Sequence, residues 1–183
     1  MTNGIDTDAL SATIEAVKNQ PELAQVSFNV HSQWTGGCHQ RATTGELIQN
    51  GSVVESRQST YVLESDEPAA LLGTDKAANP AEYILHALAG CYSVTYASLA
   101  ATEGIELDSL RLELAADLDL QGFLNLNDEV RPGISRIRVD VHATSPNATD
   151  AQLAALTRAV QERSPIRDTL AGAVDVQTVL VRD

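Results

Sequence analysis

The sequence predicts an α+β fold in which antiparallel sheets wrap around long, buried central helices. One such helix is indicated by residues 79–103, which are rich in helix formers and carry no charged side chain between Glu82 and Glu103. Segments that alternate apolar and polar residues come in blocks before and after it, without a repeated strand–helix–strand unit. The longest of these, at 110–120, has one polar face, which favours antiparallel pairing.

The composition is typical of a soluble globular protein. The 183 residues suffice for one domain or for one domain with an added segment. The formal net charge of −13 argues against nucleic acid as a partner, because binding phosphates requires clustered Lys and Arg. No basic segment followed by an apolar one opens the chain, and two cysteines do not make a disulfide framework. We therefore expect a cytoplasmic protein.

Before the long helix, the sequence predicts a short helix followed by a sheet. Residues 7–19 carry an apolar stripe on a helical period, with Asp6 or Thr7 as the cap and Gln20-Pro21 as the stop. The segments that follow are a strand at 26–30, a turn at Gly36-Gly37, a hairpin turn at Asn50-Gly51, a strand at 61–63 and a loop at 66–78.

The helix at 79–103 begins at Asn79-Pro80, a cap residue followed by proline at the first helical position. Its opposite faces are both apolar, so we expect it to be buried nearly all round. Its length approaches that of a membrane span, but His86 and Ser93 favour the core of a soluble protein and no membrane. Cys91 lies in the middle of this helix.

After the helix, alternation and turn residues predict a hairpin, two helices and a final strand. Gly104 is a natural terminator, and Ser164-Pro165 separates the two later helices. The predicted segments are a strand at 110–120, a return strand at 137–143, a helix capped by Thr149 or Asp150, a shorter helix to Leu170 and a last strand at 174–180.

Two interpretations of Cys91 follow from the residues alone. A cysteine in the middle of a helix is commonly a small buried apolar residue, whereas a nucleophile needs a nearby cation or dipole and access to substrate. His86 is the only candidate cation on the helix, and it points about 140° away from Cys91. The histidines and Cys38 lack the spacing of a metal site, and no Gly-rich loop indicates a nucleotide. We expect neither metal nor cofactor, and an activating group must come from elsewhere in the fold or from another chain.

Three blocks of sequence, in order, resemble the OsmC/Ohr family of osmotically induced and organic hydroperoxide resistance proteins. They are NPAEYILHALAGC at 79–91, GFLNLNDEVRPG at 122–133 and ERSPIRDTLAGAVDV at 162–176. The resemblance covers residues 25–183, so we expect an OsmC-like domain there and an N-terminal helical extension at 1–24. It implies an intertwined homodimer. In characterised members a reactive cysteine near the subunit interface reduces organic hydroperoxides, and a second cysteine resolves the sulfenic acid as a disulfide.

Carried over residue by residue, the resemblance places the peroxidatic cysteine at Cys91. The family's resolving cysteine precedes a proline, and the matching residue is Ser164, which could equally be a helix N-cap. One branch has a glutamate directly after Asn-Pro, whereas Glu82 stands one position further on. That branch also has an arginine directly after a Gly-Gly turn, where this chain has Cys38, and Arg41 follows three residues later. The two-cysteine mechanism therefore cannot be transferred unchanged.

Two functions from different classes stay open. The first is a thiol-dependent peroxidase that uses Cys91 and is resolved by Cys38 or by an external thiol. The second is an OsmC-like dimer that binds a hydrophobic small molecule near Cys91 without turnover. A cation close to Cys91 favours the enzyme, and Arg41 and Arg131 are the candidates.

The neighbours of Cys91 on its helix indicate the kind of ligand. Ile84 and Leu88 lie on the same face and would desolvate an alkyl chain, which favours organic hydroperoxides over hydrogen peroxide. Glu82 and Ser164 complete the predicted substrate-binding residues. If the Gly-Gly turn lies as it does in the family, Cys38 comes within reach of Cys91 after a modest loop movement and can form a disulfide with it; the alternative is that Cys38 is an incidental exposed thiol in a turn.

Overall fold

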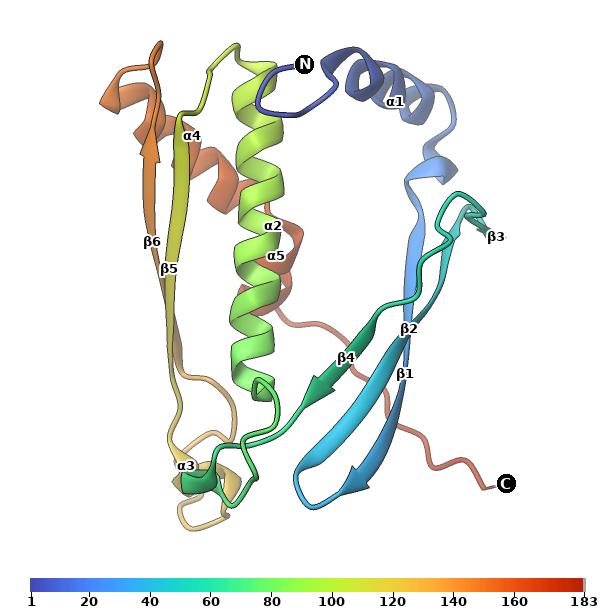
Figure 1. The fold of residues 1–183 in the computed structure, drawn as a ribbon, viewed down its shortest axis with the longest axis vertical. Helices are drawn as coiled ribbons and strands as arrows, with labels where there is room; N and C mark the ends of the chain where they lie inside the picture. The colour runs from blue at the N-terminus through green and yellow to red at the C-terminus, as the bar shows by residue number, and fades with distance from the viewer. Residues whose placement is uncertain (183) are drawn as a thin grey trace. The chain divides into compact units, whose positions relative to one another are not determined.

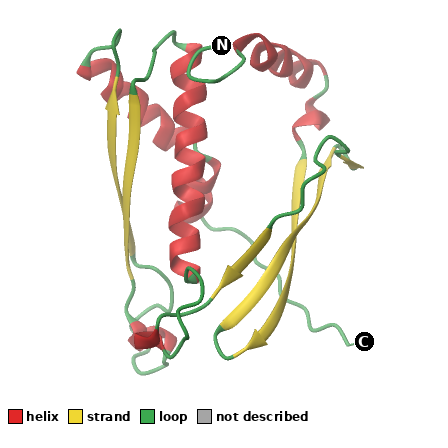
Figure 2. Cartoon of the chain, in the orientation of Figure 1, coloured by secondary structure: helices red, strands yellow, loops and turns green. Residues whose placement is uncertain are grey.

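The computed structural model describes residues 1–182 and confirms the α+β class with antiparallel sheets (Figures 1 and 2). The helices are α1 (Thr7–Asn19), α2 (Pro80–Thr102), α3 (Leu120–Phe123), α4 (Asp150–Arg163) and α5 (Pro165–Ala171). The strands are β1 (Val26–Gly36), β2 (His39–Gln49), β3 (Ser52–Val53), β4 (Val62–Ser65), β5 (Ser109–Asp117) and β6 (Arg136–Thr144). The chain forms two compact units, one of residues 6–84 and one of residues 1–5 with 85 onward.

The unit of residues 6–84 is a helix followed by an antiparallel sheet. Helix α1 begins as predicted, because the Asp6 carboxylate accepts hydrogen bonds from the backbone N–H groups of Asp8 and Ala9. Strand β2 is the centre of the sheet and pairs with β1, β3 and β4. Asn50 and Gly51 adopt the left-handed backbone that the predicted hairpin turn requires.

One buried carboxylate organises the loop between β4 and α2. Asp66 is 1% exposed, and it accepts hydrogen bonds from the Thr74 hydroxyl and from the backbone N–H groups of Glu67, Thr74 and Lys76. The Thr74 hydroxyl and then these backbone donors lower the pKa of Asp66 from its usual 3.8 to about 2, against the opposing effect of burial. Gly73 closes the loop: a Cβ atom there would lie 1.7 Å from the carbonyl oxygen of Glu67.

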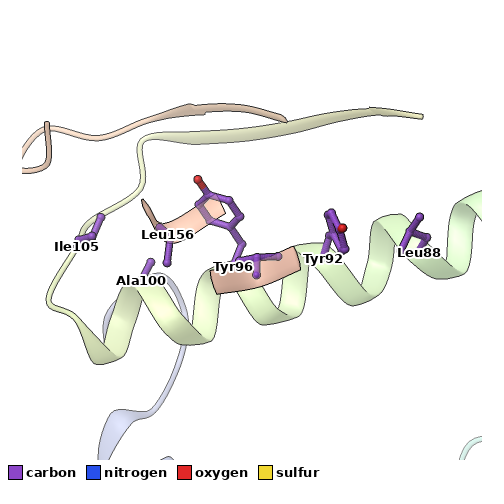
Figure 3. Packing of buried hydrophobic residues seen from close by; sticks show 7 residues of the cluster. Leu88, Tyr92, Tyr96, Ala100, Ile105 and Leu156 are labelled. Carbon is purple, nitrogen blue, oxygen red and sulfur yellow. The ribbon is translucent and has the colours of Figure 1, made fainter. Parts of the chain in front are cut away.

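The main core belongs to the other unit and lies between α2, α4 and the β5–β6 hairpin (Figure 1). Strands β5 and β6 pair antiparallel from Ser109 opposite Thr144 to Asp117 opposite Arg136, and alternate residues of each are half-buried. Figure 3 shows the centre of this core. Its fully buried members are Leu88, Tyr92, Tyr96 and Ala100 of α2, Ile105, and Leu156 and Val160 of α4.

The first residues of the chain are attached to this unit by one side chain. The Asn3 amide donates a hydrogen bond to the carbonyl of Ile105 at 2.8 Å and accepts one from the backbone N–H of Leu107 at 2.9 Å. These bonds hold residues 1–5 beside the segment that follows α2, where Gly104 ends the helix in a left-handed conformation.

Two predictions about the elements beside this core are wrong in detail. The strand predicted at 110–120 ends at Asp117, because the Asp119 carboxylate accepts the backbone N–H of Gln121 and begins α3. Helix α2 is not buried nearly all round in a single chain. It buries one stripe along its length, whereas Val94 is 66% exposed.

The strand predicted at 174–180 is also wrong for the single chain. Residues 173–182 are extended and pair with no strand among the described residues (Figure 2). Alternation of apolar residues gives a segment two faces, but a strand also needs a neighbouring edge that supplies hydrogen bonds. Val176 is accordingly 82% exposed.

Candidate functional site

Cys91 sits in the middle of α2, half-buried, with its helix fixed firmly at the N-terminal end. Asn79 and Glu82 form a reciprocal cap, in which each side chain accepts the other's backbone N–H at 2.8 Å. Pro80 takes the first helical position, as predicted. Glu82, a predicted binding residue, is thus placed in the helix cap.

The closest polar partner of the thiol is Ser164, which lies 73 residues further along the chain. Its hydroxyl donates a hydrogen bond to Cys91 Sγ at 3.1 Å. The same oxygen accepts the backbone N–H of Arg167 at 3.3 Å, so Ser164 is also the N-cap of α5. Ser164 is 1% exposed. Ser164 is therefore the helix N-cap that the sequence offered, and its hydroxyl also contacts the thiol; its predicted role in substrate binding stays a prediction.

Packing between α2 and α4 places Ser164 beside the thiol. The Tyr96 hydroxyl is hydrogen-bonded to the Thr157 hydroxyl at 2.9 Å and donates to the carbonyl of Leu153 at 3.3 Å. Leu156 and Val160 are 1% exposed and lie about two turns and one turn, respectively, before the end of α4. Because α4 ends at Arg163, this packing places the next residue, Ser164, beside the middle of α2.

The helix that Ser164 caps also carries a positive charge close to the site. Arg167, in the first turn of α5, is half-buried, and its charge acts on Tyr92, the residue after Cys91. Burial raises the pKa of the Tyr92 phenol, the charge of Arg167 opposes that rise, and the charge of Cys91 adds to it. Arg167 and Cys91 thus act electrostatically on the same phenol.

The apolar residues predicted beside Cys91 are on α2. Leu88, one turn before Cys91, is 3% exposed and belongs to the core, and Ile84, two turns before it, is half-buried. Leu88 is therefore enclosed in the core, and of the two residues only Ile84 remains partly accessible on the N-terminal side of the thiol.

Cys38 and Arg41 belong to the unit of residues 6–84. Cys38 is exposed in the turn between β1 and β2, and its thiol donates to the carbonyl of Leu72 at 3.7 Å. Arg41 is exposed on β2, with its Nε 3.8 Å from a carboxylate oxygen of Glu64. The structure thus brings Cys91 and Ser164 together within one unit, whereas Cys38 and Arg41 belong to the other unit.

Arg131, the other cation proposed from the sequence, lies in the loop after α3. Its side chain is exposed, and its carbonyl packs against Gly122, where a Cβ atom would lie 2.5 Å from it. Within residues 1–182, no three His, Cys, Asp or Glu side chains come together as a metal site requires. Helix α2 has the length and composition of a membrane span, features that the core helix of a soluble protein shares.

Comparison with known proteins identifies the family. A family model described as OsmC-like protein matches residues 73–179, more than half of the chain. This chain belongs to that family. No protein among the curated ones matches it.

Solved OsmC-like structures share the fold. An OsmC-like protein from Mycoplasma pneumoniae superposes with a TM-score of 0.60 at 18% identity, covering 80% of this chain and 88% of that one. An organic hydroperoxide resistance protein OsmC from Legionella pneumophila gives 0.53 at 19% identity, with 82% and 93% covered. An organic hydroperoxide resistance protein from Elizabethkingia anophelis gives 0.54 at 13% identity, with 80% and 89% covered.

Sequence reasoning missed one residue at the site of this OsmC-like chain. Arg167 was not among the candidate cations, because its place beside Tyr92 depends on how α5 packs on α2. A signal was nevertheless present. Arg167 is the third residue after the predicted cap Ser164, and the backbone N–H at that position is the one that an N-cap side chain binds.

Proposed function

We propose that this protein is a thiol-dependent peroxidase that reduces organic hydroperoxides through Cys91. One observation carries the proposal: in a chain of the OsmC-like family, a buried hydroxyl donates a hydrogen bond to the sulfur of the mid-helix cysteine. Such a bond stabilises the thiolate, which is the form that attacks a peroxide. The similar proteins from Legionella and Elizabethkingia are described as organic hydroperoxide resistance proteins, which supports the same substrate class.

In this proposal the residues of the site have distinct roles. The Cys91 thiolate attacks one peroxide oxygen, the O–O bond breaks, and the remaining oxygen leaves as an alcohol after taking up a proton. Cys91 is thereby oxidised to a sulfenic acid. Ser164 holds the sulfur in place, and the half-buried side chain of Ile84 favours an alkyl hydroperoxide over hydrogen peroxide.

Stopped-flow measurement of cumene hydroperoxide consumption with a dithiol reductant tests the proposal. We expect Cys91→Ser to reduce consumption to the uncatalysed level, and cumene hydroperoxide to react faster than hydrogen peroxide. Cys38→Ser is the matched control, because it removes the other thiol without touching the contact between Cys91 and Ser164. If Cys91 is inert in the folded wild type, the peroxidase is excluded and the binding of a hydrophobic molecule becomes the better description.

We also propose a cytoplasmic homodimer. Apolar side chains are exposed in each unit of the single chain, among them Phe28 and Trp34 of β1, Val94 of α2 and Val176 of the C-terminal segment. Exposed apolar surface of this extent is typical of an interface with another subunit. The cytoplasm suits a chain whose proposed function depends on reduced thiols.

A further inference from the structure

Three observations about Arg167 indicate that it can bind a ligand near Cys91. Its backbone is linked to Cys91 by two successive hydrogen bonds through Ser164, of 3.3 and 3.1 Å. Its charge acts on Tyr92, next to Cys91 in the sequence. Within residues 1–182, no carboxylate lies within 4.0 Å of its guanidinium. Arg167 is half-buried, its backbone is held beside Ser164, and its side chain has no carboxylate partner within residues 1–182, so it is available to an anion that comes to the site from outside.

Because residue 164 is a serine, it cannot reduce the Cys91 sulfenic acid, and this step needs a thiol from another source. The group in hydrogen-bond contact with Cys91 Sγ is a hydroxyl, which cannot form a disulfide with a sulfenic acid. Cys38 is exposed in the other unit and bonded to the Leu72 carbonyl. Cys91 is the single cysteine among the described residues of its own unit, 1–5 and 85–182, so this unit holds a residue that positions the sulfur but supplies no resolving thiol.

We propose that Arg167 is a specificity residue that binds the carboxylate of a small external thiol, and that this thiol reduces Cys91 after each turnover. The inference rests on the peroxidase function proposed above. A planar guanidinium can bind a carboxylate through two parallel N–H···O bonds, which would orient the thiol of the same molecule toward the sulfur. Because Cys91 is half-buried, a small thiol fits the site better than a protein thiol does.

The reaction balances with two molecules of this thiol. The first attacks the sulfur of the Cys91 sulfenic acid, an S–S bond forms, the S–O bond breaks, and the oxygen leaves as water with the proton of the thiol. The second attacks the small-molecule sulfur of this mixed disulfide and releases Cys91 as thiolate. Overall, one hydroperoxide and two thiols give one alcohol, one water and one small disulfide.

The test compares two thiols that differ only in charge, 3-mercaptopropionate and 3-mercaptopropionamide. Wild-type protein is first oxidised with one equivalent of cumene hydroperoxide, and formation of the sulfenic acid is verified by mass. The rate at which each thiol restores free Cys91 is then measured, with the rates corrected for the thiolate fraction of each reagent. We expect the carboxylate to react about tenfold faster than the amide, the effect of one hydrogen-bonded charge pair.

Variants assign this preference to Arg167. We expect Arg167→Gln to abolish the preference and Arg167→Lys, which keeps the charge but loses the fork, to retain part of it. Arg158→Gln, an exposed arginine of α4, removes the same charge elsewhere in the unit and should keep the full preference. Circular dichroism checks that each variant is folded, and Arg167→Lys provides a second variant should Arg167→Gln not fold.

The outcomes separate this inference from the proposed function. If Cys91 is not oxidised by the hydroperoxide, both fail. If Cys91 is oxidised but the two thiols react equally fast, or Arg167→Gln keeps the preference, only the role of Arg167 fails. A disulfide between Cys38 and Cys91, formed in the wild type before any thiol is added, would overturn the need for an external thiol.

Discussion

Among individual residues, the contact between Cys91 and Ser164 has the largest chemical consequence. The Ser164 hydroxyl has one proton, and it is directed at the sulfur, while the oxygen accepts the N–H that begins α5. The cap therefore fixes the direction of the donated bond, because the backbone N–H can only be bound by the oxygen lone pairs. A single buried side chain thus couples the start of a helix to the state of the thiol.

Removing this hydroxyl should slow the reactions of Cys91. We expect Ser164→Ala to lower the rate of alkylation by iodoacetamide near neutral pH by about fivefold, since one hydrogen bond contributes about 1 kcal/mol. Rates are measured by mass spectrometry of the peptide that contains Cys91. Ser93→Ala is the control, because the Ser93 hydroxyl is bonded to the Ala89 carbonyl of its own helix. Equal alkylation of wild type and Ser164→Ala would show that the bond does not activate the thiol.

Exchanging the oxygen of Ser164 for sulfur should create a resolving thiol. The Ser164 oxygen lies 3.1 Å from Cys91 Sγ, so a thiol at the same place needs only a small shift to form a disulfide. We expect Ser164→Cys, treated with one equivalent of cumene hydroperoxide, to give a crosslink between the two positions in non-reducing peptide mapping. Persistence of a Cys91 sulfenic or sulfinic acid in this variant, with no crosslink, would contradict the geometry.

The sequence located Cys91 and Ser164 by resemblance, whereas their contact required the fold. No spacing rule joins positions 91 and 164, because α4 must pack on α2 before the two meet. The electrostatic effect of Arg167 on Tyr92 depends on the packing of the helices in the same way. Local sequence patterns describe one element at a time, so they cannot predict a contact between residues of two different helices.

Among the helices, the packing of α4 on α2 is what positions the site, and Leu156 is its centre. Leu156→Ala removes a side chain that is 1% exposed, and we expect a loss of about 2–5 kcal/mol in the free energy of unfolding. Urea denaturation followed by circular dichroism measures it. Leu126→Ala, at a leucine that is 71% exposed, should change the stability by less than about 0.5 kcal/mol. A similar small loss for both would show that α4 is not part of the core.

The stability of the loop between β4 and α2 should depend on pH, because it depends on the charged carboxylate of Asp66. Its folded pKa, about 2, lies below the usual 3.8, so the charged carboxylate stabilises the loop above about pH 4. This stabilisation is lost as the pH falls from 3.8 toward 2. We expect Asp66→Asn to lower the urea midpoint near pH 7, and the difference from the wild type to shrink over that interval.

Asp75→Asn is the matched control for this loop. It changes the same charge on an exposed residue whose left-handed backbone asparagine also tolerates. Its urea midpoint should follow that of the wild type at every pH. An Asp66→Asn variant with an unchanged midpoint at neutral pH would contradict the role of the buried carboxylate.

Elements with strong local signals were predicted closely. The cap at Asp6, the Asn79-Pro80 start of α2 and the paired alternation of β5 and β6 are all confirmed. The strand predicted at 174–180 failed because pairing depends on an edge outside the segment. The burial of α2 failed for a related reason, since a helix can only be covered by what packs against it.

For the molecule as a whole, the exposed apolar residues lead to a prediction about assembly. We expect a two-fold homodimer that buries more than about 2,000 Å² in total. Sedimentation at micromolar concentration should give twice the mass of the chain. Val176→Asp, at an exposed valine of the C-terminal segment, should weaken the dimer if that segment lies in the interface, whereas Thr169→Asp on α5 serves as an exposed control. A folded monomer at this concentration would refute the expectation.

The anchoring of Asn3 has a consequence for the order in which the chain is made. Asn3 is synthesised before its partners Ile105 and Leu107, which follow 102 and 104 residues later. At roughly 5–20 residues per second, Asn3 therefore waits about 5–20 s for the backbone groups that it binds. During that interval residues 6–84 are free to fold as the unit to which they belong, and the first five residues join the other unit only afterwards.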